Sequence, residues 1–442
     1  MTKVLFIYPN VLKALQEQMG IAYLSAMLKA NGIETKLFDY TFEGESDLEE
    51  IMYEYDPDFV AVSARSGDFH TGLVLAKICW HAKHNVKILF GGVHPTLEPY
   101  KTMSIGFIDA VFIGESDFTL PEYILSKTNG DKLFRQIKGV VFRENGIYKG
   151  NVKSTTPDLN KIDELIKYPD HGMFKRHFGK EFYGNAGVLG TIMTSRGCPY
   201  NCSFCCNHAL KNCYDKSNAW TRFRKIENVI NEIEYCIKEY GTTHIYIVDD
   251  TFTMNKRHVI SFCDEYKKRI YQPHGVHFYC MIRADTVDEE VIGHLAGAGC
   301  KIVLLGIESG VERIRNDIYN KKVNNSDIIN IVRLAHENGI KVISFNMIGS
   351  PTETLEDAEK TLELNLDANV DDAKMTILTA FPHTKLYDDI ANKRADFGGC
   401  GINNKMPINY YAGTNIINPN MTLEQMLDFQ EYFYAAVRGK ND

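Results

Sequence analysis

Short apolar runs alternate with amphipathic stretches along the first third of the chain. Residues 4–8 form an apolar run, and residues 13–30 follow it with apolar side chains at helical spacing. Gly32 ends that stretch where helices commonly end. Further apolar runs, mostly separated by helical patterns, predict strands at 35–38, 59–62, 86–90 and 110–113. The alternation predicts an α/β fold with a doubly wound parallel sheet, which binds ligands beyond the carboxyl ends of its strands.

A second alternation of strand and helix patterns begins near residue 188. Six strand–helix units within about 190 residues are typical of a partial (β/α)6 barrel of the TIM type. Such a barrel carries its chemistry at the carboxyl ends of the strands. The expected strands are 188–194, 244–248, 277–281, 302–307, 341–348 and 373–378.

These patterns divide the chain into four parts. We expect an N-terminal Rossmann-like domain, a connecting segment with a small hairpin around 140–148, the partial barrel, and a small C-terminal cap. The cap includes a helix near 423–437, which we expect to close the barrel mouth. The expected bounds are 1–135 for the first domain, 136–185 for the connection, 186–395 for the barrel and 396–442 for the cap.

Composition narrows the class of protein. With 44% hydrophobic and 24% charged residues, the 442-residue chain has the balance of a globular protein. Its formal net charge of -8 argues against a nucleic-acid partner, because phosphate contacts need clustered Lys and Arg. We find neither a signal peptide nor an apolar run long enough to span a bilayer, so we expect a cytoplasmic protein that is not transmembrane. Eleven cysteines in such a chain indicate metal ligands and buried side chains rather than disulfides.

Three of these cysteines, Cys198, Cys202 and Cys205, stand within eight residues. Three thiolates at this spacing can bind three irons of a four-iron cluster and leave the fourth iron open for a reactant. The spacing alone also leaves open a zinc site completed by His208 or Cys206. The cluster is favoured by position, because the cysteines follow an apolar strand directly and therefore lie at the predicted barrel mouth.

The segment Gly-Cys-Pro-Tyr-Asn-Cys-Ser-Phe-Cys at 197–205 resembles the CxxxCxxC signature of radical S-adenosylmethionine (SAM) enzymes, including the aromatic Phe204. This resemblance implies a 4Fe-4S cluster on the three cysteines, with SAM bound to the open iron. It also implies SAM contacts from residues that follow later strands. One departure is Phe-Pro-His-Thr at 381–384, where relatives often have Pro-Gly-Thr. The implied SAM residues are Phe204, Asp249, Asp250, Arg283, Glu308, Ser309 and Gly349.

Two glycine-containing loops of the first domain, at 91–96 and 113–116, resemble the cobalamin-binding domain of cobalamin-dependent radical SAM enzymes. The Asp-x-His-x-x-Gly motif of mutase-type cobalamin domains is absent after the first strand, so we expect a cobalt whose lower face is not bound by histidine. An ordinary strand-to-helix turn is the alternative interpretation of the glycines. The implied cobalamin residues are Arg65, Ser66, Gly91, Gly92, Val93, His94, Gly114 and Glu115.

The resemblance implies a class B radical SAM methyltransferase, in which one SAM methylates cobalamin and a second yields the 5'-deoxyadenosyl radical that activates an unreactive substrate carbon. It also implies an oxygen-poor setting and an electron donor such as flavodoxin or ferredoxin. Three alternatives stay open: a cobalamin-dependent rearrangement or cyclisation, a radical SAM enzyme without cobalamin, and a non-enzymatic metal or cobalamin sensor. The sequence assigns no catalytic side chain, and it does not choose among a small molecule, a lipid and a peptidyl substrate.

Overall fold

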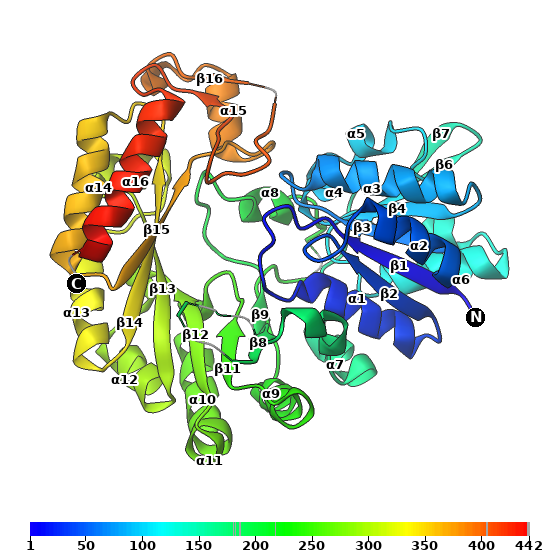
Figure 1. Ribbon diagram of the computed structural model, residues 1–442, viewed down its shortest axis with the longest axis horizontal. Coiled ribbons are helices and arrows are strands. Elements are labelled where there is room, and N and C mark those ends of the chain that lie inside the picture. Colours follow the sequence, from blue (N-terminus) through cyan, green and yellow to red (C-terminus); the bar gives the residue numbers. More distant parts are fainter. Residues whose placement is uncertain (180, 182, 185–186, 217, 404, 440–442) are drawn as a thin grey trace. The chain divides into compact units, whose positions relative to one another are not determined.

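The computed structural model describes residues 1–179, 181, 183–184, 187–216, 218–403 and 405–439. The chain forms two compact units, shown in Figure 1. Unit 1 comprises Met1–Lys180 and Ala209–Arg222, and unit 2 comprises Glu181–His208 and Phe223–Asp442. The chain therefore leaves unit 2 after His208 and returns to it at Phe223.

Unit 1 is built on a seven-stranded sheet in the order β2-β1-β3-β4-β5-β6-β7. The first five strands run parallel, and β6 and β7 are antiparallel to their neighbours. The strand order reverses between β1 and β3, as in doubly wound folds. The strands are β1 (Lys3–Tyr8), β2 (Glu34–Asp39), β3 (Phe59–Ser63), β4 (Lys87–Gly91), β5 (Ala110–Phe112), β6 (Val140–Glu144) and β7 (Ile147–Asn151).

Helices bury both faces of this sheet, because successive strand residues point to opposite sides. Leu5 and Ile7 belong to one apolar cluster with residues of α2 and α3, whereas Val4 and Phe6 belong to another with residues of α1 and α6. The predicted doubly wound sheet is therefore confirmed. The helices are α1 (Met19–Ala30), α2 (Glu45–Tyr55), α3 (Phe69–Ala82), α4 (Val93–Leu97), α5 (Pro99–Met103), α6 (Thr119–Asn129) and α7 (Leu159–Ile166).

The first helix begins later than the apolar spacing predicts. Helix α1 begins at Met19, where the Gln18 side chain accepts a hydrogen bond from the backbone N–H of Ile21. Residues 10–18 form a loop instead, in which the buried Asn10 side chain bonds to the backbone of Ala14. The predicted end is confirmed, since Gly32 has a φ of 72° directly after the helix.

The predicted hairpin is present as β6 and β7, and it extends the sheet of unit 1. Helix α7 and the 3-10 helix η2 (His171–His177) follow it within the same unit. The segment expected to connect two domains thus adds strands and helices to the first unit. The boundaries proposed from the sequence remain predictions.

Unit 2 contains a six-stranded parallel sheet in the order β15-β14-β13-β12-β11-β8. Each strand begins and ends within two residues of its predicted position. In Figure 1 helices cover one face of the curved sheet, as expected of a partial barrel. The strands are β8 (Leu189–Ile192), β11 (His244–Ile247), β12 (His277–Ile282), β13 (Cys300–Glu308), β14 (Lys341–Ile348) and β15 (Asp372–Ile377).

The outer layer of unit 2 holds the larger apolar core. It is formed by the outward residues of the strands and by the helices that join them. Smaller clusters fill the inner face and the carboxyl ends of the strands. The helices of this layer are α9 (Ile226–Tyr240), α10 (Lys256–Tyr266), α12 (Glu289–Gly297), α13 (Asn325–Glu337) and α14 (Leu355–Ala368).

The C-terminal segment differs from the expected cap in its helix. Residues 410–415 hydrogen-bond to the last residue of β15, Ile377, and to residues 378–380 beyond it, so this part does lie at the carboxyl end of the sheet. Helix α16 (Leu423–Gly439) instead packs along β15 and α14 (Figure 1). Its buried stripe Met426, Phe429, Phe433 and Val437 needs an apolar partner, which the outer layer supplies.

Among the described residues, no helix combines the length and apolarity needed to cross a membrane.

Candidate functional site

The cysteine loop follows the first strand of the partial barrel. Strand β8 ends at Ile192, and Gly197 turns the chain with a φ of 84° directly before Cys198. Only glycine adopts this conformation without strain. The three cysteines therefore lie beyond the carboxyl end of β8, where barrel enzymes place their chemistry.

Backbone contacts hold this loop against the ends of two other elements. Ser203 donates its N–H to the Tyr319 carbonyl at 2.9 Å and its hydroxyl to the Ile318 carbonyl at 2.5 Å. Leu386 donates its N–H to the Ser203 carbonyl at 2.9 Å. The ring of Phe204, a predicted SAM residue, lies edge-on to Tyr319 with a 5.2 Å centroid separation. These contacts hold the loop against residues 318–319 and 386.

Each predicted cluster sulfur has its own hydrogen-bond partner. Cys198 Sγ lies 3.8 Å from Thr251 Oγ1, Cys202 Sγ accepts from Arg283 Nη1 at 3.6 Å, and Cys205 Sγ accepts from the Asn207 backbone N–H at 3.5 Å. Hydrogen bonds to the sulfurs are a means by which proteins tune such clusters. The donor set therefore fits a 4Fe-4S cluster.

Within the described ranges, no three His, Cys, Asp or Glu side chains converge on a point that would hold one metal ion. A cubane cluster places each thiolate on a different iron, so this finding concerns single ions and leaves the cluster prediction as it was.

Protonation favours the same interpretation of the thiols. Burial raises the pKa of Cys198 and of Cys202, and a hydrogen bond with Cys206, followed by burial, raises the pKa of Cys205. Without a metal these side chains stay thiols near neutral pH. A bound metal deprotonates a coordinating thiol outright, so the loop has the chemistry of a site completed by its metal.

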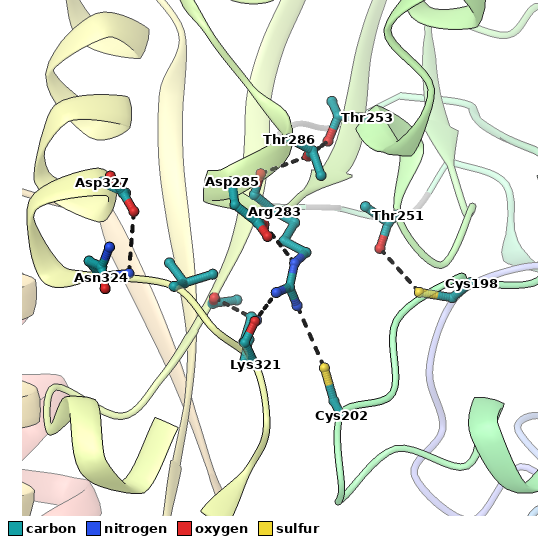
Figure 2. A network of polar contacts seen from close by, with 12 residues as sticks. Cys198, Cys202, Thr251, Thr253, Arg283, Asp285, Thr286, Lys321, Asn324 and Asp327 are labelled. Carbon is teal, nitrogen blue, oxygen red and sulfur yellow. Dashed lines mark hydrogen bonds and ion pairs between the residues drawn. The ribbon is translucent and has the colours of Figure 1, made fainter. Parts of the chain in front are cut away.

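Arg283, at the end of β12, is central to the polar network drawn in Figure 2. Its Nε lies 2.6 Å from Asp285 Oδ1, its Nη2 donates to the Lys321 carbonyl, and its Nη1 donates to Cys202. The guanidinium also lies 4.0 Å from the centroid of the Tyr200 ring. This predicted SAM residue therefore contacts the cysteine loop twice.

The two predicted acidic residues after β11 differ in environment. Asp249 is 1% exposed, and its carboxylate accepts from the Thr194 N–H at 2.7 Å and from the hydroxyls of Thr194 and Ser195 at 2.5 Å each. Burial raises its pKa to about 6. Asp249 thus fastens β11 to the end of β8, whereas Asp250 is exposed.

Glu308 is the last residue of β13 and Ser309 follows it, and the two have separate partners. Glu308 adopts a φ of 67° and forms an ion pair with Lys321 at 2.6 Å, which also donates to the Gly306 carbonyl at 2.7 Å. Ser309 is fully buried, and its hydroxyl accepts the Val311 N–H at 3.2 Å. Lys321, which the sequence did not single out, therefore links this loop to the Arg283 network.

The turn after β14 is closed by a buried carboxyl group. Glu353 is fully buried, and its Oε2 accepts the N–H groups of Gly349 at 2.7 Å and Ser350 at 2.8 Å. Burial raises its pKa to about 8. Gly349, a predicted SAM residue, has a φ of 95°, and an added Cβ would lie 2.9 Å from Met426 Sδ.

The first predicted cobalamin loop, in unit 1, packs tightly on its neighbour. Strand β4 ends at Gly91, and the next residue, Gly92, has a φ of 94°. A Cβ on Gly92 would lie 2.7 Å from the Ala64 carbonyl oxygen. Val93 and His94 begin helix α4. His94 Nδ1 is 3.1 Å from Ser66 Oγ. The centroid of the His94 ring lies 4.0 Å from the centroid of the Phe69 ring. The loops after β3 and β4 thus meet at the carboxyl edge of the sheet.

The neighbouring charged residue, Arg65, is half-exposed and forms an ion pair with Asp68 at 2.6 Å.

The second predicted cobalamin loop, at residues 113–116, contacts residues 209–222. These residues follow the cysteine loop in sequence and belong to unit 1. Glu115 donates its N–H to Tyr214 Oη at 2.7 Å and pairs with both terminal nitrogens of Arg222. A Cβ on Gly114 would lie 2.5 Å from the same Tyr214 oxygen. We call residues 209–222 the strap.

Two buried pairs close the carboxyl edge of the sheet beside β1 and β2. His171 Nδ1 lies 2.6 Å from Glu17 Oε2, and His177 Nε2 lies 2.6 Å from Asp39 Oδ2. Although burial alone would raise the pKa of Asp39, hydrogen bonds from His177 and Thr41 lower it overall. The sequence did not indicate either pair, because the partners are 154 and 138 positions apart.

Comparison with known families covers both units. Residues 192–364 match the Radical SAM superfamily, and residues 10–124 match the B12 binding domain. The chain is 31% identical over 376 residues to an uncharacterized methyltransferase of Pyrococcus horikoshii, which covers 84% of this chain and 77% of that protein.

Two more distant proteins are similar over most of the chain. One is the anaerobic magnesium-protoporphyrin IX monomethyl ester cyclase of Cereibacter sphaeroides, 26% identical over 409 residues, with 88% of this chain and 64% of the cyclase covered. The other is the solved structure of the radical S-adenosylmethionine methyltransferase TsrM from Kitasatospora setae, with cobalamin and a 4Fe-4S cluster bound. Its TM-score is 0.77 at 18% identity, with 99% of this chain and 89% of that chain covered. At this identity the likeness shows the fold.

Proposed function

The chain belongs to the cobalamin-dependent radical SAM methyltransferase family, and from that premise we propose that it methylates an unactivated carbon with two SAM molecules. Enzymes of this family use a 4Fe-4S cluster, SAM and cobalamin. Together they supply a methyl group and a 5'-deoxyadenosyl radical that removes a substrate hydrogen. The protein binds and orients these groups.

The observation that carries the proposal is the ordered cysteine loop. Cys198, Cys202 and Cys205 follow the first barrel strand, and each sulfur has its own hydrogen-bond partner. In our proposal they bind three irons of the cluster. The side chains named from the later strand ends surround SAM, with Asp250 rather than the fully engaged Asp249 toward its amino group.

We assign cobalamin to the carboxyl edge of the unit 1 sheet. The loops after β3, β4 and β5 carry the predicted residues there, and Gly92 permits the close packing of two of these loops. On the β1 and β2 side, the His171–Glu17 and His177–Asp39 pairs occupy the edge. This arrangement supports the β3–β5 side as the binding face.

The test uses full-length protein prepared anaerobically with iron, sulfide and cobalamin. With SAM and a low-potential reductant, we expect both S-adenosylhomocysteine and 5'-deoxyadenosine. Cys202→Ala should abolish 5'-deoxyadenosine formation, and Cys236→Ala, at a cysteine buried in the outer core, serves as the matched control. Loss of the homocysteine product from active wild-type protein would remove methyl transfer from the proposal.

A cyclisation is the second candidate, favoured by the similarity to the anaerobic cyclase over 88% of this chain. The chain spans slightly less than two thirds of that relative. Methyl-labelled SAM separates the two reactions, because only a methyltransferase places the label in its product.

The electron donor and the cellular setting are part of the same proposal. A flavodoxin- or ferredoxin-type protein would deliver the single electron that reductive SAM cleavage needs. We place the enzyme in the cytoplasm, where thiols stay reduced. The substrate is a small molecule, a lipid or a peptidyl side chain, and a screen of these three classes with labelled SAM would decide among them.

A further inference from the structure

Arg283 contacts the cysteine loop at two residues, Cys202 and Tyr200. It is 6% exposed, and its Nε, Nη1 and Nη2 atoms contact Asp285, Cys202 and the Lys321 carbonyl. The guanidinium carbon lies over the ring of Tyr200, two residues before Cys202, at 4.0 Å from the ring centroid. Figure 2 shows the side chain pointing from the end of β12 toward the cysteine loop.

The contact with Cys202 differs in kind from those of the other two sulfurs. Thr251 and the Asn207 N–H are neutral groups, whereas Arg283 brings a full positive charge. A charge-assisted hydrogen bond is roughly twice as strong as a neutral one. Because Arg283 is buried and Cys202 is half-buried, water screens the charge less than it would at an exposed site.

Other charges also act on Cys202. Lys321 acts in the same sense as Arg283, and Glu308, which pairs with Lys321 at 2.6 Å, opposes both. Asp285 opposes Arg283, but it lies on the Nε side and its side chain is 31% exposed, so water screens it more. Arg283 Nη1 is the charged donor that hydrogen-bonds to the Cys202 sulfur, at 3.6 Å.

We propose that Arg283 is a positioning residue that fixes the cysteine loop through Tyr200 and Cys202 and raises the reduction potential of the bound cluster. The inference rests on the proposed function, because it requires that Cys202 bind the cluster. One electron enters the cluster on reduction, and no covalent bond forms or breaks. The added negative charge is stabilised by the nearby guanidinium, so the reduced state becomes easier to reach.

The experiment is an anaerobic redox titration of the full-length, iron- and sulfide-loaded protein without SAM. Dithionite supplies the electron, and electron paramagnetic resonance reports the reduced cluster. In Arg283→Gln we expect the ratio of reduced to oxidised cluster at a fixed potential to fall about tenfold, equivalent to about 59 mV for one electron. Arg283→Lys keeps the positive charge but loses the several N–H donors of the guanidinium, so its midpoint potential should shift less than that of Arg283→Gln.

Asp285→Asn supplies a test of opposite sign. Removing this carboxylate leaves the Arg283 charge uncompensated, so the reduced fraction should rise. Arg333→Gln is the matched control, because this exposed arginine pairs with Glu337 on the outer helix α13. Its midpoint potential should equal that of the wild type.

The outcomes separate the inference from the proposed function. Wild-type protein that binds no iron–sulfur cluster overturns the proposed function itself. An Arg283→Gln protein with full iron content and a wild-type midpoint, but weaker SAM binding, overturns the inference and leaves Arg283 as a SAM ligand. If Arg283→Gln does not hold a cluster, Asp285→Asn decides, because an unchanged or lowered midpoint there contradicts the proposed charge effect.

Discussion

At the scale of single residues, the sharpest expectation concerns the buried carboxyl of Glu353. Burial raises its pKa from 4.5 to about 8, and its Oε1 has no hydrogen-bond partner in the described structure. A raised folded-state pKa means that the unfolded chain ionises first. The stability that Glu353 contributes is therefore complete below about pH 4.5 and is lost as the pH rises toward 8.

Replacement of Glu353 by Gln tests the direction in which stability changes with pH. Glu353→Gln keeps an oxygen that accepts from Gly349 and Ser350 but cannot ionise, so it should match the wild type near pH 5 and exceed it at pH 9 by a few kcal/mol, at about 1.4 kcal/mol per pKa unit. Glu353→Ala removes the acceptor and should destabilise the turn at both pH values. Unfolding curves from pH 5 to pH 9 measure the difference, and parallel curves for wild type and Gln variant would contradict it.

At the scale of elements, the contact between Gly114 and the strap leads to a further prediction. Gly114→Ala adds a Cβ 2.5 Å from Tyr214 Oη and strains a φ of 76°. We expect a loss of about 2–4 kcal/mol in the stability of unit 1 and weaker retention of cobalamin.

Gly130→Ala is the matched control, since Gly130 has nearly the same φ of 73° but nothing within 4 Å of the added Cβ. It should cost only about 1–2 kcal/mol, from the left-handed backbone. Unfolding of each variant and the absorbance of retained cobalamin provide the measurements. Equal effects of the two substitutions would show that the Tyr214 contact has no role.

The strands of the barrel follow the sequence pattern more closely than the helices do. Buried parallel strands are nearly continuous apolar runs, so all six barrel strands could be placed within two residues of their ends. Helix α1 begins later than predicted because Leu15 continues the apolar spacing and Gln18 is not a usual cap residue. The C-terminal helix was recognised, but its partner was not, since an amphipathic stripe does not specify which surface it covers.

Some residues of the candidate site could be identified from the sequence, and others could not. The cysteines could be found because their spacing is local, and the family resemblance supplied the strand-end residues. Tyr214 and Arg222 were missed because they contact residues 99 and 107 positions away, which no local pattern records. The roles of Asp249 and Arg283 could not be read from their motifs, because only the folded chain shows which polar groups already engage them.

At the scale of the whole molecule, the division of the chain has a direct consequence for its first unit. Residues 1–180 form most of unit 1, but the unit is completed by the strap, which follows the cysteine loop in sequence. The strap supplies Tyr214 against Gly114 and Arg222 against Glu115. A fragment ending at residue 180 therefore lacks the partners of a predicted cobalamin loop.

We expect a fragment of residues 1–222 to retain cobalamin and a fragment of residues 1–180 to lose most of it. Glu115→Gln in the longer fragment should give an intermediate result, because it weakens the Arg222 pair but leaves Tyr214 in place. Bound corrin absorbance after gel filtration measures retention, and circular dichroism confirms that each fragment is folded. Equal retention by two folded fragments would show that the parallel strands bind cobalamin without the strap. Retention by the longer fragment alone would mean that residues 181–222 are required for cobalamin binding, and the contacts of Tyr214 and Arg222 with Glu115 are the structural reason for that requirement.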